Sequence, residues 1–343
     1  MKIFYYKDPH GNFGDDLNEW VWEALAPGLW DERSPVHFSG IGTIIGPTMP
    51  SAPSWVVFSS GAGYGPAPED FGGVGWELSC VRGPLTAKVL GLDENLVVSD
   101  GAMLLSRVPG LEPLAESERE GVVFMPHHHA LYTGAWEEVC ARAGIAYLDP
   151  RADSRATLER IRGAKLVVAD AMHAAITADA LRVPWVPVTT SREISTFKWL
   201  DWTLSLGLPY EPLPLPQSTT AEAVRSATLP LYAYDFALKD HSLEGAMAHY
   251  RLDHARKAAR SWPMRRNLGH GLVKRALLPM VRSGVLAPVR RPLDERRLDR
   301  AAQALRAAAR ARPVLSSQAA WERAVGELSL RLEAVVRARS LAA

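Results

Sequence analysis

The feature that most constrains this chain is the alternation of short β-rich runs with helical patterns through its first two-thirds. Residues 2–7, 55–60 (WVVFSS) and 166–169 have the composition of strands, whereas residues 84–90 and 154–162 have that of helices. Such alternation is typical of α/β proteins, in which helices connect the parallel strands of a sheet. The sequence therefore predicts an α/β fold built on parallel sheets.

A polar segment with two prolines, residues 107–120, interrupts this alternation before a new buried strand begins at residue 122. After the proline-rich residues 212–216, the composition changes to Ala, Leu and Arg with helical spacing. We therefore expect an N-terminal α/β domain over 1–110, a second α/β domain over 120–215 and a helical extension over 220–343. Two facing Rossmann-like domains form a cleft, and ligands of such sheets bind outside the carboxyl ends of the strands.

Cysteine content and hydropathy indicate the cellular setting. The two cysteines, Cys80 and Cys140, are too few for a disulfide framework or a thiolate metal site. No segment has the pattern of a signal peptide, and the longest uncharged stretch, residues 39–68, is interrupted by glycines and prolines. We therefore expect a cytoplasmic protein without a transmembrane helix.

Charge is distributed unevenly along the chain. Residues 235–343 contain 22 Lys and Arg against 10 Asp and Glu, a net charge of +12, whereas residues 1–234 carry −11. A basic extension indicates either an anionic partner, such as membrane lipid or nucleic acid, or charge complementarity within the molecule. The basic residues are not interleaved with aromatic ones, so we do not expect nucleic-acid binding.

Three glycine-rich junctions are candidate ligand loops. The first follows the first expected strand and contains Asn12, Gly14 and Asp15; the others are residues 39–46 and residues 59–65, which include Gly61 after the strand at 55–60. Glycines allow a close approach of the backbone to a ligand, and exposed N–H groups in such turns bind anions. Ordinary turns and a helix cap at Asp15 or Asp16 are the structural alternatives.

Arg82 and Asp100 are each expected directly after a strand, the second after a strand at 96–98. The planar guanidinium of Arg82 is suited to a carboxylate or phosphate, with a surface ion pair as the alternative. Lys198 stands among aromatic residues after the strand expected at 186–188. Its neighbours Trp199 and Trp202 either stack on a sugar or fill the core.

Histidines occur at two further strand ends. In an extended backbone, the side chains of residues 127–129 would point to alternate sides, so we expect at most two of these histidines to line the cleft, with His127 and His128 as the candidates. No carboxylate or cysteine stands at ligand spacing beside them, so no metal site is predicted. His173 begins a helix after the strand at 166–169, where the helix dipole favours a neutral imidazole able to accept a proton.

Taken in order, the segments 11–15 (GNFGD), 81–84 (VRGP), 99–102 (SDGA), 171–174 (AMHA) and 197–199 (FKW) resemble those of the polysaccharide pyruvyl transferase family. The resemblance is greatest to bacterial exopolysaccharide members and covers about residues 1–210. It implies a GT-B-like fold, phosphoenolpyruvate as donor, and a saccharide acceptor that is lipid-linked. It implies neither a metal nor a further cofactor.

The resemblance also assigns roles to individual residues. Arg82 would bind the donor anion, Lys198 would be a second cation, and His173 would be the acid/base, with Asp15 or Asp100 orienting groups or activating a hydroxyl. Many family members have an arginine where this chain has Ala171. Arg82 and Lys198, assisted by His127 or His128, would then have to supply that charge.

Two other functions remain open at the level of sequence. A sugar-nucleotide glycosyltransferase would also suit two facing α/β domains with glycine-rich and basic edges. A non-catalytic protein that binds glycans or a membrane surface would explain the basic extension, since residues 271–282 mix apolar and basic side chains around Pro279. Peripheral contact with the inner face of the cell membrane is compatible with either enzyme. The acceptor sugar, the ketal stereochemistry and the oligomeric state are not determined.

Overall fold

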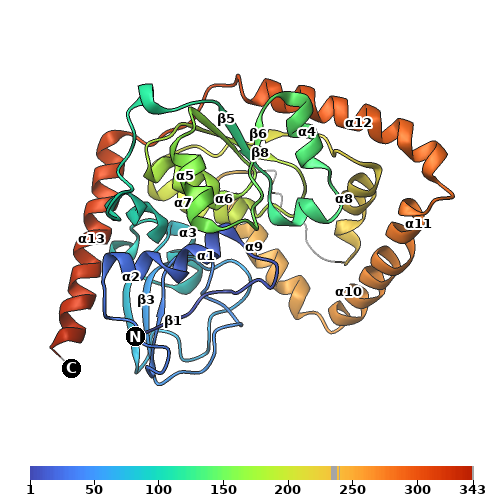
Figure 1. Cartoon of the computed structure of the whole chain (residues 1–343). Coiled ribbons are helices and arrows are strands. Elements are labelled where there is room, and N and C mark those ends of the chain that lie inside the picture. The colour runs from blue at the N-terminus through green and yellow to red at the C-terminus, as the bar shows by residue number, and fades with distance from the viewer. Residues whose placement is uncertain (233–237, 239, 342–343) are drawn as a thin grey trace.

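The computed structural model describes residues 1–232, 238 and 240–341 (Figure 1). It confirms the α/β class, because the described residues form two separate parallel sheets with helices around them. Both cysteines are buried and free. Among the described helices, none combines the length and the apolar composition needed to cross a membrane.

The first sheet has four parallel strands that lie side by side in chain order. They are β1 (Lys2–Ile3), β2 (Val36–Ser39), β3 (Ser54–Ser60) and β4 (Trp76–Val81). The helices of this domain are α1 (Phe13–Asp16), η1 (Leu17–Glu19), α2 (Val21–Leu25), α3 (Pro84–Leu90), η2 (Glu94–Leu96) and η3 (Gly101–Arg107).

The second sheet has five parallel strands in the order β6-β5-β7-β8-β9. These are β5 (Val122–Met125), β6 (Ala146–Tyr147), β7 (Leu166–Ala169), β8 (Trp185–Thr189) and β9 (Leu213–Pro214). Its helices are η4 (Glu116–Glu118), η5 (His128–Tyr132), α4 (Trp136–Ala143), α5 (Ser154–Arg162), α6 (Met172–Ala180) and α7 (Thr196–Ser205).

Helices dominate the rest of the chain and contact both sheet domains. They are α8 (Thr220–Tyr232), α9 (Leu243–Ala258), α10 (Trp262–Gly271), the π-helical η6 (Leu272–Leu277), α11 (Leu278–Arg282), α12 (Ala287–Ala308) and α13 (Gln318–Ser340). Helix α12 packs on α4, Val314 pairs with Trp185 of β8, and α13 returns to the first domain (Figure 1). There Arg331 donates hydrogen bonds to the carbonyls of Ser79 and Asn95. The extension therefore joins the two sheet domains from outside.

The local predictions were accurate where capping signals were strong. The helices expected over 84–90 and 154–162 and the strand over 166–169 have those bounds in the structure. The strand expected over 2–7 is shorter, since β1 ends at Ile3. The strand expected over 96–98 was wrong. Asp93 accepts a hydrogen bond from the N–H of Asn95 and draws the chain into η2, which leaves one isolated bridge between Val97 and Val81.

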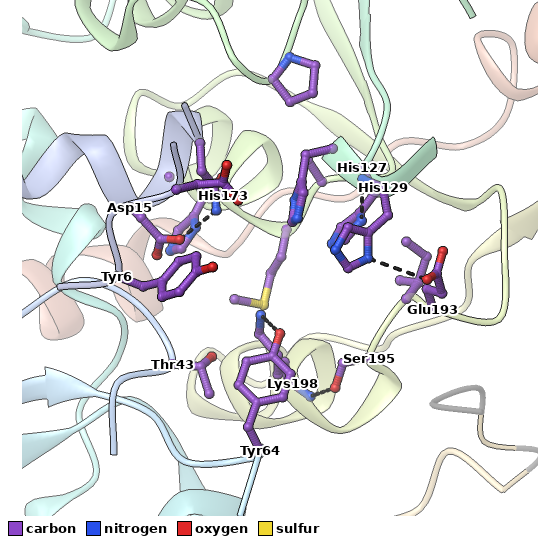
Figure 2. A pocket seen from close by; sticks show the side chains of 18 of the residues that line it. Tyr6, Asp15, Thr43, Tyr64, His127, His129, His173, Glu193, Ser195 and Lys198 are labelled. Atoms are coloured by element: carbon purple, nitrogen blue, oxygen red, sulfur yellow. Dashed lines mark hydrogen bonds and ion pairs between the residues drawn. The ribbon is translucent and has the colours of Figure 1, made fainter. Parts of the chain in front are cut away.

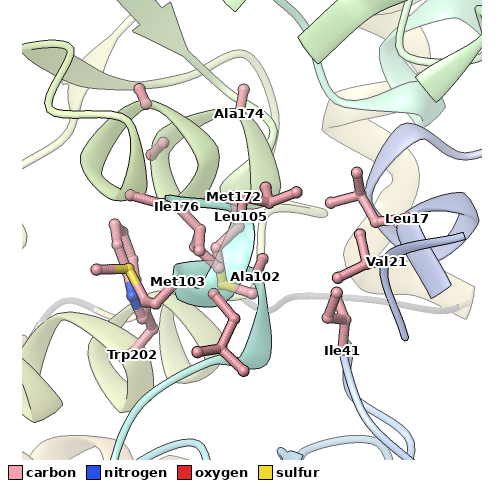
Figure 3. Close-up of a cluster of buried hydrophobic side chains, with 14 of the residues drawn as sticks. Leu17, Val21, Ile41, Ala102, Met103, Leu105, Met172, Ala174, Ile176 and Trp202 are labelled. Carbon is pink, nitrogen blue, oxygen red and sulfur yellow. The ribbon is translucent and has the colours of Figure 1, made fainter. Parts of the chain in front are cut away.

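One apolar core extends from the first domain into the second (Figure 3). Leu17, Val21 and Ile41 come from the first domain, and Met172 and Ile176 come from α6 of the second. Side chains of η3 lie between them, namely Ala102, Met103 and Leu105. Because this interface is buried and hydrophobic, it holds the two domains in one fixed relation.

A buried ion pair crosses the same interface. Arg82, at the end of β4, has no exposed surface, and its Nε donates to Oδ2 of Asp201 in α7 at 2.9 Å. Asp201 also accepts hydrogen bonds from the backbone N–H and the hydroxyl of Thr86. A Cβ on Gly61 would lie 2.2 Å from the Arg82 guanidinium, and one on Gly83 would lie 1.8 Å from the Asp201 carbonyl oxygen. The two glycines therefore make room for this pair.

We expect Arg82→Ala or Asp201→Ala to lower the free energy of unfolding by about 3–5 kcal/mol, because each leaves a buried charge without its partner. The double variant Arg82→Met/Asp201→Leu should lose less than the sum of the single variants. Urea unfolding followed by circular dichroism measures these differences. Arg33→Ala serves as the control, because that side chain is 93% exposed. A loss below about 1 kcal/mol, the range of exposed pairs, would contradict this role of the ion pair.

Candidate functional site

A cavity of about 660 Å³ lies between the two sheet domains, at the carboxyl ends of strands from both sheets (Figure 2). The first domain lines it with residues that follow β1, β2 and β3. The second lines it with residues that follow β5, β7 and β8. The segments concerned are 12–15, 43–48, 127–129, 171–173 and 193–195, together with Tyr64 and Lys198. Lys257, Trp262 and Arg266 of the helical extension complete the wall.

His173 lies in the first turn of α6 and faces two elements of the first domain. Its Nε2 is 3.7 Å from Oδ2 of Asp100, and its side chain is 12% exposed. Neither atom has a hydrogen-bond partner among the described residues. Asp100 is fully buried, and its other oxygen caps η3 by accepting from the N–H of Ala102. A Cβ on Gly14 would lie 1.9 Å from Nδ1 of His173, so only glycine permits this contact. Gly14 and Asp100 therefore hold the imidazole from two sides.

Asp15 is a second titratable group in the cavity wall. Burial raises the pKa of its carboxyl to about 6, although His173 and Lys198 act in the opposite direction. Asn12 donates a hydrogen bond of 2.5 Å from its side-chain amide to Oδ2 of Asp15. A carboxyl with this pKa exchanges protons near neutral pH, which is the range that general acid–base catalysis uses.

Lys198 brings a cation to the floor of the cavity. It lies in the first turn of α7, whose N-cap is Ser195. Its ammonium group donates to the hydroxyl of Tyr64 at 2.9 Å, so this contact joins the two domains across the cavity (Figure 2). The Lys198 ammonium is consequently fixed beside a hydroxyl group in the space where a ligand would bind.

All three adjacent histidines line the cavity, so the expectation that at most two of them face it was wrong. The reason is that β5 ends at Met125. His127 caps η5, and its Nδ1 accepts a hydrogen bond from the N–H of His129 at 3.3 Å. The chain therefore turns, and the rings of His127, His128 and His129 lie 4.1–5.0 Å apart. The alternation of side chains holds for an extended backbone and not for a 3₁₀ turn.

Burial keeps these imidazoles neutral. It lowers the pKa of His128 to about 4 and that of His129 to about 3, and the pKa of His127 is also well below its usual range. Lys198 and Arg225 lower these values further. At pH 7 the three histidines therefore offer hydrogen-bond donors and acceptors and do not supply positive charge.

The same three histidines are the described residues that come closest to a shared metal site. Their candidate ligand atoms lie within 4.8 Å of one another. Tetrahedral zinc with bonds of 2.0–2.1 Å requires nitrogen atoms about 3.4 Å apart, a spacing that lies within this limit. Oε1 of Glu193 is 3.6 Å from Nδ1 of His129, whereas the charges of Lys198 and Arg225 nearby act against a bound cation. Because of these cations, polar contact with a substrate is the role that we assign to the three histidines.

Three predicted site residues do not line the cavity, namely Arg82, Gly61 and Asp100. Asp100 is fully buried beside His173. The guanidinium of Arg82 is bound by Asp201, and Gly61 packs against it. Nη1 of Arg82 nevertheless donates to the hydroxyl of Thr43, which does line the cavity.

Trp199 and Trp202 are buried against Trp185. Trp202 fills the core, whereas Trp199 also lines the cavity.

Sequence reasoning did not single out several residues of the wall, among them Thr43, Tyr64, Glu193 and Arg266. Thr43 and Tyr64 nevertheless stand in two of the glycine-rich junctions that were expected to line a ligand site. Glu193 is bound by Arg225 of α8, 32 residues away, at 2.6 Å. Arg266 comes from α10, far along the chain, where no local pattern separates it from the other arginines.

Comparison with known proteins supplies the class of this site. Residues 75–192 match the family model described as polysaccharide pyruvyl transferase. The chain is also 38% identical over 241 residues to the succinoglycan biosynthesis protein ExoV of Rhizobium meliloti (strain 1021), covering 70% of this chain and 75% of that protein. No solved structure gives a significant match.

The chain belongs to the polysaccharide pyruvyl transferase family. The family and the enzyme class expected from the sequence are thereby confirmed. The matched region contains Arg82, Asp100, the three adjacent histidines and His173, and so includes most of the second-domain wall of the cavity.

We expect Asp15→Asn to raise the melting temperature at pH 7.5 and to have little effect near pH 4. The pKa of this carboxyl is about 6 in the folded protein and near 3.8 for an ordinary aspartate. The protonated form is therefore favoured by folding. That stabilisation is complete below pH 3.8 and is lost as the pH rises through 6, where the buried charge becomes a penalty.

Differential scanning fluorimetry at pH 4.5, 6 and 7.5 measures this difference. Glu32→Gln is the matched control, because the Glu32 side chain is 77% exposed. A shift that is the same at all three pH values would contradict the assigned titration of Asp15.

Proposed function

We propose that this enzyme transfers the pyruvyl group of phosphoenolpyruvate to a sugar of an exopolysaccharide or its lipid-linked precursor, forming a pyruvate ketal. The observation that carries the proposal is the convergence of His173, Asp15 and Lys198 on one cavity of a polysaccharide pyruvyl transferase. A GT-B-like arrangement belongs to this proposal, since the cavity lies between two α/β domains. So does a cytoplasmic site of action at the inner face of the membrane, where a lipid-linked acceptor is accessible.

Phosphoenolpyruvate carries two anionic groups, and the cavity contains cations to bind them. Lys198 is fixed by Tyr64, and Arg266 enters from the extension. In this proposal these two residues supply the charge that Ala171 lacks. Residues in the first turns of α6 and α7 line the same cavity, and helix N-termini favour a bound phosphate or carboxylate. Arg82 acts on the site only through Thr43 and the domain interface.

The reaction needs an acid and a base in sequence. Protonation of C3 of phosphoenolpyruvate turns the enol carbon C2 into an electrophile, and a sugar hydroxyl adds to C2 and loses its proton. A neighbouring hydroxyl then displaces phosphate from C2, which closes the ketal and releases a second proton. His173, oriented by Asp100, delivers and accepts protons, and ionised Asp15 activates a hydroxyl.

The neutral histidines suit the acceptor. Uncharged imidazoles can both donate hydrogen bonds to sugar hydroxyls and accept them. His127, His128 and His129 all line the second-domain wall, and Figure 2 shows His127 and His129 across the cavity from Asp15. We propose that they position the two reacting hydroxyls, a task that needs directional contacts and no net charge.

Phosphate release from phosphoenolpyruvate tests this proposal, measured with crude lipid-linked and short oligosaccharide acceptors. We expect acceptor-dependent release that His173→Ala lowers by at least about 100-fold, the range of general acid–base catalysis. Asp100→Asn, a positioning variant, should lower kcat by less and shift the pH profile. His10→Ala is the matched control, since His10 is exposed and does not line this cavity.

A contrary result would be turnover of a sugar nucleotide without turnover of phosphoenolpyruvate. That outcome would make the protein a glycosyltransferase. Each variant is first compared with the native chain by circular dichroism, so that loss of folding is not counted as loss of chemistry.

Removal of metal ions should leave this activity unchanged, because protons and fixed cations carry the proposed reaction. The measurement is phosphate release before and after dialysis against EDTA, followed by addition of Mg²⁺, Mn²⁺ or Zn²⁺. A loss on dialysis that one ion restores would show that the adjacent histidines hold a metal after all.

A further inference from the structure

A segment of the helical extension is exclusively basic among its charged residues. Residues 254–293 contain ten Lys and Arg and no Asp or Glu. They form the end of α9, then α10, η6, α11 and the start of α12, which arch around α8 at the side of the molecule (Figure 1). A continuous run with this composition creates a positive potential at the surface that it covers.

Large apolar side chains are exposed on the same helices. Their positions repeat every four residues, close to the period of an α-helix, so Met264 and Leu268 lie on one side of α10, and Val289 and Leu293 lie on one side of α12. The first set lies on α10 and η6, and the second lies at and before the start of α12. The exposed fractions are 62% for Met264, 67% for Leu268, 54% for Leu272, 86% for Val285, 65% for Val289 and 44% for Leu293.

The apolar residues that pack the extension onto the protein are a different set from these exposed ones. Val273, Leu278 and Val281 of η6 and α11 are buried against α8, where they pack with Ala221 and Leu229. The helices η6 and α11 therefore already bury apolar side chains against the protein. The exposed apolar side chains are additional to these and are turned toward solvent. We call the exposed set, with Arg265, Arg275, Arg282 and Arg291 around it, the basic apolar face.

We propose that the basic apolar face docks on the surface of an anionic lipid bilayer. Apolar side chains that enter the interface beside cations that meet phosphate headgroups are the features of a peripheral membrane surface. A polyanion such as nucleic acid would use the cations but leave the apolar side chains in water. A second copy of the same face would place like charges against each other. Charge complementarity and exposed apolar area together therefore select the bilayer.

The position of this face relative to the cavity supports the same inference. Trp262 and Arg266 belong to α10 and also line the cavity. Arg282 of α11 donates a hydrogen bond to the carbonyl of Tyr132, another residue of the cavity wall. Docking would therefore bring the cavity close to the membrane plane. The functional value of a cavity near the membrane rests on the proposed lipid-linked acceptor, whereas the docking itself does not.

Co-sedimentation of the full chain with vesicles tests the proposal without any turnover. We expect binding to vesicles with 30 mol% phosphatidylglycerol, little binding to phosphatidylcholine alone, and weaker binding as salt rises. Each cation at such a surface contributes roughly a fivefold gain. Arg275→Glu/Arg291→Glu should therefore weaken binding by at least about 25-fold. Leu268→Ser/Val289→Ser should weaken it independently of salt.

The matched control is Leu330→Ser/Arg323→Glu on α13, where Leu330 is 59% exposed outside the face. Absence of binding, or equal binding by native protein and both face variants, would overturn the proposal. Loss of a dimer in light scattering in place of loss of vesicle binding would make the face a self-association surface instead.

Phosphate release with a short soluble acceptor separates the docking proposal from the proposed reaction. It should be unaffected in the face variants, and its absence from the native enzyme would refute the proposed reaction while leaving the vesicle result intact.

Discussion

The buried pair of Arg82 and Asp201 is the contact on which the geometry of this protein depends. It joins the end of β4 in the first domain to α7 in the second, with both side chains fully removed from solvent. Such a pair tolerates little displacement, because separating the charges without water costs several kcal/mol. It lies in the interface formed by the shared apolar core, so the two domains are fixed by packing and by charge together. Lys198 is three residues before Asp201 on α7, and the same contact therefore sets where that ammonium stands in the cavity.

Parallel sheets explain why the polar groups gather there. Every strand of both sheets directs its carboxyl end toward the interface, and the loops that follow carry the polar residues of the site. Asp170 shows how the loops are tied together. It follows β7 and is fully buried, and it accepts hydrogen bonds from the N–H of His127 and from Thr190, which follow β5 and β8. The positions of the histidine cluster and of Glu193 thus derive from one buried carboxylate between adjacent strands.

The helical extension has consequences for both the fold and the site. Helix α12 covers α4, α13 returns to the first sheet, and α10 contributes Trp262 and Arg266 to the cavity. The two cations that compensate for Ala171 in the proposed reaction, Lys198 and Arg266, therefore both lie outside the family match over 75–192. Helix α10 carries part of the basic apolar face and also lines the cavity, so a membrane docked on this face would lie near the proposed site of reaction.

The sequence by itself determined the elements whose signals are local. The α/β class, the helices at Pro84 and Ser154, and the position of His173 shortly after β7 follow from alternation, caps and glycines. Tertiary structure decided which of those polar groups share a cavity. Arg82 has the local pattern of an anion ligand, but Asp201 lies 119 residues away and binds it first. The rule for extended chains predicted that the three adjacent histidines could not all face one site, but the turn after Met125 places all three in the cavity wall. Arg266 entered the wall from a helix without a distinguishing pattern. The local sequence specifies which residues have suitable chemistry for a site. Long-range packing decides which of them reach the cavity and which are buried in contact with an opposite charge, because the partners are far apart in the sequence.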